Sequence, residues 1–120
     1  MSITVEQYRA LNRQHSKHNN KIITRHGLTF LSIAQADRWD ELLLCERAGL
    51  IKDLKHEVPF KFEVNGMHIC TYKADATYYD NQVKIWVAED TKGHRTRLYQ
   101  IKAKLFKALY PEWWFREVEV

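Results

Sequence analysis

The sequence has few cysteines and no long apolar run, and each shortage excludes a class of protein. Its two cysteines, Cys45 and Cys70, form neither a disulfide framework nor a metal-binding Cys-x-x-Cys motif, so we expect two reduced thiols, buried or half-buried. No run approaches the ~20 apolar residues of a membrane span, and the first residues lack the apolar segment of a signal peptide. We therefore expect a cytoplasmic protein without membrane contact.

Acidic residues are absent from two long stretches, although the net charge is only +4. No Asp or Glu occurs from Gln7 to Ala36, and a second such stretch runs from Thr91 to Pro111. Both contain several lysines and arginines, and they flank an acidic group. Segregated basic charge predicts a polyanionic partner such as nucleic acid; the alternative is a pair of ordinary solvated helix faces.

Length and pattern predict one domain preceded by a basic arm. With 120 residues, 45% of them hydrophobic, the chain can fill one core but not two. We expect a helix over 4–15, a basic loop over 16–21 that orders on a partner, and either a small hairpin or an extended arm over 22–30. The arm thus covers 1–31, and a single domain covers 32–120.

Helical periodicity occurs twice in this domain. Ser32 can cap a helix over 32–48, in which apolar residues recur at the 3.6-residue spacing of one face. A second helix is predicted over 95–109, and Pro111 ends it. We expect the buried face of the second helix to consist of Leu98, Ile101, Leu105 and Leu109.

Alternating apolar residues and turn signals predict four strands. Asn65-Gly66 is a strong hairpin signal between the first two, and a turn at Tyr79–Asn81 leads into the third. The last strand follows a helix, so it should run parallel to a strand of this meander. The order α, β, β, β, α, β predicts an α+β fold with a mixed central sheet. The predicted strands are Phe60–Val64, Met67–Thr77, Val83–Ala88 and Trp113–Val120.

Two carboxylates and a lysine are expected to meet where two of these strands end. Asp90 and Lys92 are two apart, so in a strand their side chains point to the same face. If the second and third strands pair as neighbours, Asp75 arrives beside Asp90. Carboxylate oxygens suit a hard divalent cation such as Mg²⁺, and the amine could position or deprotonate a water. The alternative is a turn residue beside a solvated strand end, because Asp-x-Lys is a short pattern.

Several short pieces in a fixed order also carry a family resemblance. They are Lys17–Lys21, Gly27–Ser32, Ala48–Leu54, Thr71–Asp75, Glu89–Gly93 and Tyr99–Phe106. With an acid ending the second strand and acid-x-Lys ending the third, the chain resembles the PD-(D/E)XK nuclease superfamily. Within it, the chain is similar to small phage and prophage proteins related to phage endonuclease I and Holliday-junction resolvases. The resemblance implies a restriction-endonuclease-like αβββαβ core and, for a phage-encoded chain, the host cytoplasm.

The resemblance also implies roles for individual residues. Asp75 would be the motif aspartate and a ligand of Mg²⁺ or Mn²⁺. Asp90 would be the second metal ligand, with the Thr91 carbonyl as a further one. Lys92 would orient or activate the attacking water and stabilise charge that develops on the phosphate.

Gln35 departs from the pattern of these relatives. They usually carry a glutamate here, within Ser-x-x-Glu, that completes the metal site, whereas this chain reads Ser32-Ile33-Ala34-Gln35. A glutamine still offers a carbonyl oxygen, but it carries no charge to attract a cation. Gln35 can instead serve locally, reaching back to the Ser32 amide in a capping box. Both roles stay open.

These observations together predict a Mg²⁺-dependent endonuclease acting on DNA, with branched DNA as one candidate substrate. By analogy with resolvases, whose paired cuts need two sites, we expect a homodimer. The alternatives are a DNA-binding module that keeps the nuclease fold without catalysis, and a structural or assembly protein unconnected with nucleic acid. The residues expected to contact the DNA backbone are Lys17, Lys21, Arg95, Arg97 and Lys102.

Overall fold

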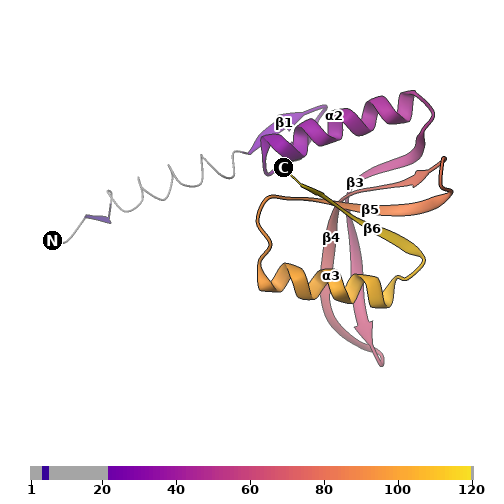
Figure 1. Ribbon diagram of the computed structural model, residues 1–120. Helices are drawn as coiled ribbons and strands as arrows, with labels where there is room; N and C mark the ends of the chain where they lie inside the picture. Colours follow the sequence, from indigo (N-terminus) through magenta and orange to yellow (C-terminus); the bar gives the residue numbers. More distant parts are fainter. Residues whose placement is uncertain (1–3, 6–21, 120) are drawn as a thin grey trace. The chain divides into compact units, whose positions relative to one another are not determined.

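The computed structural model describes Thr4, Val5 and residues 22–119 (Figure 1). Most of the predicted helix over 4–15 and all of the loop over 16–21 lie outside these residues. The chain divides into two compact units, Met1–Asp37 and Arg38–Val120, and each is described by itself. No helix in the described part of the chain is long and apolar enough to cross a membrane. The two cysteines are free and half-buried, as expected.

The first unit contains the predicted hairpin. Strands β1 (Ile23–Arg25) and β2 (Leu28–Phe30) pair antiparallel. The two residues between them, His26 and Gly27, have φ angles of 54° and 74°, the positive values that a tight two-residue hairpin turn requires. Helix α2 (Ile33–Arg47) begins in this unit and continues into the second, within one residue of its predicted bounds at each end.

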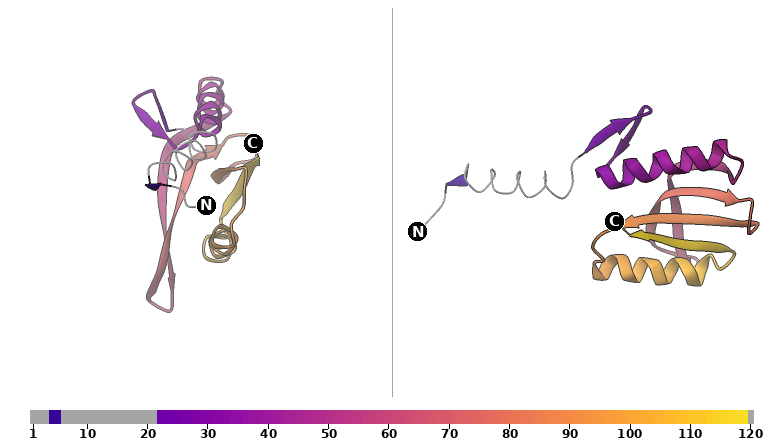
Figure 2. Two further views of the ribbon diagram at one scale, coloured as in Figure 1. Left: turned by 90° about the vertical axis from the view of Figure 1, so that its left-hand side faces the viewer. Right: turned by 45° about the horizontal axis from the view of Figure 1, so that its top comes forward.

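The second unit is built on a mixed sheet with the strand order β3-β4-β5-β6. The first three strands pair antiparallel, and β6 pairs parallel with β5 after the crossover through helix α3, as Figure 2 shows. The predicted fold class and element order are therefore confirmed. The elements are β3 (Ile51–Val64), β4 (Met67–Asp80), β5 (Ile85–Lys92), α3 (Arg97–Leu109) and β6 (Trp113–Glu119).

Strands β3 and β4 are longer than predicted. The residues from Ile51 onward contain Pro59 and many charges, so their sequence did not predict a strand. Strand β3 lies at the edge of the sheet, where proline and charge are tolerated. The predicted turn at Tyr79–Asn81 is wrong, because Tyr79 and Asp80 belong to β4. The Asp80 carboxylate accepts hydrogen bonds from the next amides along the chain, those of Gln82 and Val83. The turn therefore follows β4, and β5 begins and ends later than predicted.

The core of the second unit lies between the sheet and α3. Phe106 of α3 contacts aromatic rings from β3, β4 and β6, with a centroid separation of 4.9 Å to Phe60. The predicted buried face of α3 is wrong for Leu98 and Ile101, which are 62% and 56% exposed. Leu105 and Leu109 do pack against the core and are half-buried. Aromatic residues bury more apolar area and fill the neighbouring stripe instead. The buried residues of α3 are Tyr99, Ala103 and Phe106.

Candidate active site

The end of β5 buries two neighbouring carboxylates on opposite faces of the sheet. Glu89 is 1% exposed and Asp90 is 3% exposed. Ala88 and Asp90 share the face that α3 covers, while Glu89 contacts Arg38 of α2. Burying a carboxylate is costly unless hydrogen bonds or opposite charges compensate for the lost water. The partners of these two acids therefore indicate what each one does.

Asp75 reaches the end of β5 from an irregular part of β4. The β4–β5 ladder ends at the pair Ala76↔Glu89. Beyond it, the Thr91 amide donates a hydrogen bond of 2.7 Å to Asp75 Oδ2. Opposite Asp75 on β3, Glu57 has a φ of 52°, which is unusual for a residue other than glycine. Irregularities of this kind re-aim side chains next to functional sites.

Near Asp75, the alternate residues of β4 switch from one face of the sheet to the other. Tyr72, before Asp75, belongs to the core under α3, whereas Tyr78, after it, contacts Glu89 on the other face. Residues an even number apart would share a face in a regular strand. The change lets a single strand supply a tyrosine to each of the two buried carboxylates of β5.

Asp90 keeps one oxygen without a hydrogen bond. The Tyr72 hydroxyl donates to Asp90 Oδ2 at 2.5 Å. Asp90 Oδ1 is buried and has no hydrogen-bond partner among the described residues, with the Lys92 ammonium 3.4 Å away. Lys92 Nζ also lies 4.6 Å from the ring centroid of Tyr99 in α3. The structure thus brings Asp75, Asp90 and Lys92 together, as the spacing predicted.

Burial shifts the pKa values of both aspartates upward, and the charge of a neighbouring acid adds to each shift. Burial, followed by the charge of Asp90, raises the pKa of Asp75 to about 7, although the Thr91 amide and Lys92 oppose the shift. Burial also raises the pKa of Asp90, against the Tyr72 hydrogen bond and the charge of Lys92. Two carboxylates that resist ionising together gain from any cation placed between them.

The free oxygens define what a metal could use. Asp75 Oδ1 and Asp90 Oδ1 accept no hydrogen bond from the described residues, while each Oδ2 is held by a donor. No group of three or more His, Cys, Asp or Glu suited to a metal ion occurs within residues 22–119. Carboxylate oxygens are the ligand type that a hard cation takes, and the Thr91 carbonyl stays a predicted further ligand.

Gln35 has the local role. Its side-chain oxygen accepts a hydrogen bond of 3.1 Å from the Leu31 amide, and its own amide donates to Ser32 Oγ at 3.1 Å. The predicted capping box used the Ser32 amide, so the observed one is displaced by one residue. The metal-ligand role of Gln35 stays a prediction.

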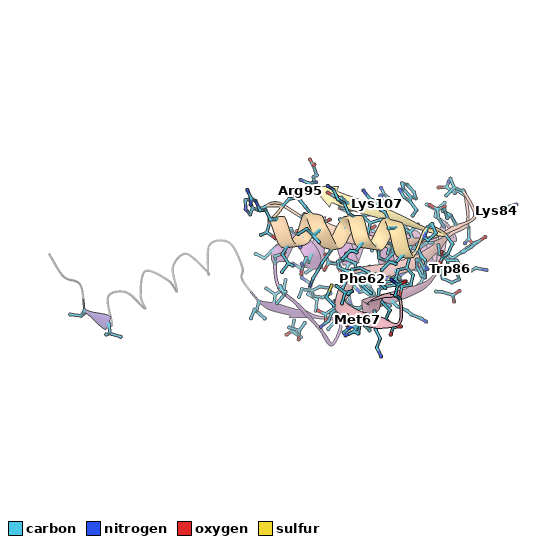
Figure 3. The ribbon with its side chains drawn as sticks, turned by 90° about the horizontal axis from the view of Figure 1, so that it is seen from below. Phe62, Met67, Lys84, Trp86, Arg95 and Lys107 are labelled. Carbon is cyan, nitrogen blue, oxygen red and sulfur yellow. The ribbon has the colours of Figure 1, made fainter. Side chains whose placement is uncertain are left out.

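The residues predicted to contact DNA differ in their surroundings. Arg95 precedes α3, at one end of the helix in Figure 3, and pairs with Glu117 at 2.5 Å and with Glu119. The prediction that Arg95 lies on the helix is therefore wrong. Arg97 is exposed in the first turn of α3, and Lys102 Nζ lies 3.4 Å from the Thr71 carbonyl of β4. Lys17 and Lys21 lie outside the described residues.

A comparison with protein families places the chain. The family model described as "Protein of unknown function (DUF1064)" matches residues 15–119. The chain belongs to this family. No curated protein and no solved structure matches the chain. The part matched by the DUF1064 model contains both candidate carboxylates and Lys92, but its description names no activity, so a function has to be argued from the chemistry of the site.

The partners of Glu89 were not predicted from the sequence. Arg38 donates from Nε and Nη2 to the two oxygens of Glu89 at 2.7 and 2.9 Å, and Tyr78 donates to Oε1 at 2.7 Å. Glu89 shares the alternation of Ile85 and Val87, which is the apolar face of its strand, and an acid on such a face requires a buried partner. That signal predicts a partner, but it does not say which arginine or tyrosine supplies it.

Proposed function

We propose that the protein is a Mg²⁺- or Mn²⁺-dependent endonuclease that hydrolyses phosphodiester bonds in DNA. The observation that supports it most is the meeting of Asp75, Asp90 and Lys92, with one free oxygen on each carboxylate and the lysine amine 3.4 Å from Asp90. The resemblance to PD-(D/E)XK nucleases supports the same proposal, because the three residues stand in the order of that motif. Branched DNA is the candidate substrate, and paired cuts would require a homodimer.

Each residue has a distinct task in this proposal. Asp75 and Asp90 would hold the cation through their free oxygens, and the main-chain carbonyl of Thr91 would add a neutral ligand. A bound cation would supply charge neutralisation at the scissile phosphate and acidify a water. Lys92 orients that water and stabilises charge on the phosphate, and its half-buried amine is already held between Asp90 and the Tyr99 ring.

The basic residues at the start of α3 are suited to hold the DNA backbone. Arg97 is exposed, and Lys102 lies farther along the same helix, one turn after Leu98. Contacts of this kind give affinity that falls with salt and reads no sequence. Lys17, Lys21 and Arg95 are proposed to add to them, although Arg95 would have to share its guanidinium with Glu117.

Replacing Asp90 by alanine tests the proposal. Wild-type protein should cleave a four-way junction, linear duplex or single-stranded DNA in the presence of Mg²⁺ or Mn²⁺. Asp90→Ala should reduce the rate at least ~100-fold because one of two charged metal ligands is lost, while salt-dependent DNA binding persists. The control is Glu63→Ala, which removes an exposed acid from the tip of the β3–β4 hairpin. Cleavage by Asp90→Ala at the wild-type rate would contradict the assignment.

A DNA-binding module without catalysis is the second candidate. The observation that favours it is Gln35, which is uncharged and whose oxygen is already bonded to the Leu31 amide. Salt-dependent binding of wild-type protein to DNA, with no product from any of the three substrates, would support the module. Absence of any DNA affinity would contradict both candidates and favour a structural or assembly role.

A further inference from the structure

Two tyrosines of the core stand beside Asp90 and Lys92. Tyr72 comes from β4 and is 4% exposed; Tyr99 comes from α3 and is 7% exposed. Both belong to the cluster in which phenylalanines fill neighbouring positions. A phenylalanine would occupy the same space without burying a hydroxyl, which costs about 1–3 kcal/mol when unpaired. The Tyr72 hydroxyl, which donates to Asp90, therefore does more than packing requires.

The Tyr72 hydroxyl determines which oxygen of Asp90 is free. It donates to Oδ2, so the carboxylate plane is held and Oδ1 is left facing the Lys92 ammonium. Ligating carboxylates are commonly held by such an outer hydrogen bond, which sets their orientation toward a metal. Tyr72 therefore selects a single coordinating oxygen at Asp90.

Tyr99 holds the lysine in turn. The Lys92 side chain is 30% exposed, with its ammonium 3.4 Å from Asp90 Oδ1 and 4.6 Å from the centroid of the Tyr99 ring. A lysine side chain has many rotamers, and contact with an aromatic face restricts them while the cation is attracted to the ring. Tyr99 thus keeps the amine beside the free oxygen of Asp90.

The unpaired oxygens gather at this one place. Two buried side-chain polar atoms in residues 22–119 have no hydrogen-bond partner, Asp90 Oδ1 and Tyr99 Oη. Both belong to residues that contact Lys92. Unsatisfied buried groups are rare in folded proteins and point to a site that is completed by a ligand.

We propose that Tyr72 and Tyr99 are positioning residues that direct Asp90 Oδ1 and Lys92 Nζ to one point of the site. Tyr72 acts through its hydroxyl on the carboxylate, whereas Tyr99 acts through its ring on the ammonium. The consequence for catalysis rests on the proposed nuclease function, but the two contacts themselves can be tested without activity.

The Tyr99 contact is tested by NMR of methylated lysines. Reductive methylation with ¹³C-formaldehyde gives each lysine a resonance, and Lys92→Arg identifies the one from Lys92. The ring should shift it upfield; Tyr99→Phe should keep the shift and Tyr99→Leu should abolish it. Lys52, which lies 4.9 Å from the ring centroid of Tyr79, is an internal control that neither variant should move. An unchanged Lys92 resonance in Tyr99→Leu would overturn this half of the inference.

The Tyr72 contact is tested by Mn²⁺ binding in a calorimeter. Tyr72→Phe should weaken binding roughly 10-fold, the usual effect of losing an outer-shell partner. The matched control is Tyr78→Phe, which removes an equivalent hydroxyl from the other buried carboxylate, Glu89, and should leave Mn²⁺ affinity unchanged. Equal affinities of wild type and Tyr72→Phe, or an equal loss in both variants, would overturn the Tyr72 assignment.

The two measurements separate this inference from the proposed function. Absence of Mn²⁺ binding to the wild-type protein would overturn the metal site and the Tyr72 half with it, whereas the Lys92 resonance still decides the Tyr99 half. In a protein that cleaves DNA, Tyr72→Phe and Tyr99→Leu should lower kcat with little change in KM, because neither tyrosine is proposed to bind the substrate. A change in KM alone would contradict a positioning role.

Discussion

Glu89 and Asp90 are adjacent in the chain, similarly buried, and held in different ways. Glu89 receives two hydrogen bonds from Arg38 and one from Tyr78, so both of its oxygens are satisfied and its charge is balanced. Asp90 receives one hydrogen bond, from Tyr72, and its other oxygen faces Lys92 without a hydrogen bond. Strand β5 therefore carries, on its two faces, one acid with both oxygens hydrogen-bonded and one acid with a single oxygen hydrogen-bonded.

This difference indicates a structural role for Glu89 and a place in the candidate site for Asp90. The pair of Glu89 with Arg38 joins α2 to the sheet, and the Tyr78 hydroxyl, whose pKa burial and Glu89 raise to about 12, stays a donor. Asp90 retains capacity to bind, because its buried Oδ1 accepts no hydrogen bond from the described residues. Buried acids with every oxygen satisfied are expected to support a fold, and those with one left free are candidates for a site.

The largest effect is expected from breaking the buried ion pair between Glu89 and Arg38. Glu89→Gln leaves the partly buried guanidinium of Arg38 with only the exposed Glu41 as a counter-charge, so the free energy of unfolding should fall by about 3 kcal/mol, the lower end of the range for breaking a buried ion pair. Urea denaturation of the metal-free protein measures it. The double variant Arg38→Met, Glu89→Leu should recover most of the loss, because well-packed apolar residues often replace a buried ion pair at little cost.

Asp90→Asn is the matched comparison for that experiment. Burial disfavours the charge of Asp90, so its removal should leave the stability of the metal-free protein unchanged or raise it, while Mn²⁺ binding is lost. Equal destabilisation by Glu89→Gln and Asp90→Asn would remove the distinction drawn between the two acids.

The sequence was sufficient to predict that Asp75, Asp90 and Lys92 come together, but not which groups surround them. Asp90 and Lys92 share a face because strand alternation is regular there, and Asp75 follows from the pairing of neighbouring strands. Tyr72 depends on the change of face beside Asp75, which no local pattern announces. Local periodicity is thus enough for residues on a regular strand and fails where the strand is irregular.

Tyr99 was missed for a different reason. The leucine and isoleucine spacing of α3 pointed to Leu98 and Ile101 as the core face, and the helix is rotated so that Tyr99 faces the sheet instead. The choice between two apolar stripes on one helix depends on the aromatic rings of β3, β4 and β6 that surround Phe106. Such long-range packing cannot be predicted from the sequence of the helix alone. The presence of the helix, which begins with Thr96 as its cap, could be predicted.

A smaller effect is expected from the pH dependence of stability. Folding raises the pKa of Asp75 to about 7, against about 3.9 in an unfolded chain, so the native metal-free protein holds a proton that the unfolded chain releases. Its stabilising contribution is complete below about pH 4 and is lost as the pH rises to about 7.

Asp75→Asn should remove this dependence. At pH 8 the variant should be more stable than the wild type by about 1–2 kcal/mol, and its free energy of unfolding should change less between pH 4 and pH 7. Urea denaturation at several pH values, without metal, measures both. A wild-type curve that rises with pH over this range, with no change of slope in Asp75→Asn, would contradict the pKa assigned to Asp75.

The smallest effect is expected from Gln35→Glu, which would add a negative charge to the proposed metal site of Asp90. A glutamate oxygen can still accept the hydrogen bond from the Leu31 amide, so the start of α2 and the stability of the protein should be preserved. If residue 35 stands near the cation, as the PD-(D/E)XK resemblance implies, Mn²⁺ affinity should rise roughly 3- to 10-fold, equivalent to about 0.7–1.4 kcal/mol. Calorimetry with Gln35→Glu and with the double variant Gln35→Glu, Asp90→Asn distinguishes a shared site from a second, unrelated one, because the gain should disappear when Asp90 is neutralised. An affinity that does not change in the single variant would leave Gln35 as a helix cap and the site with two charged ligands.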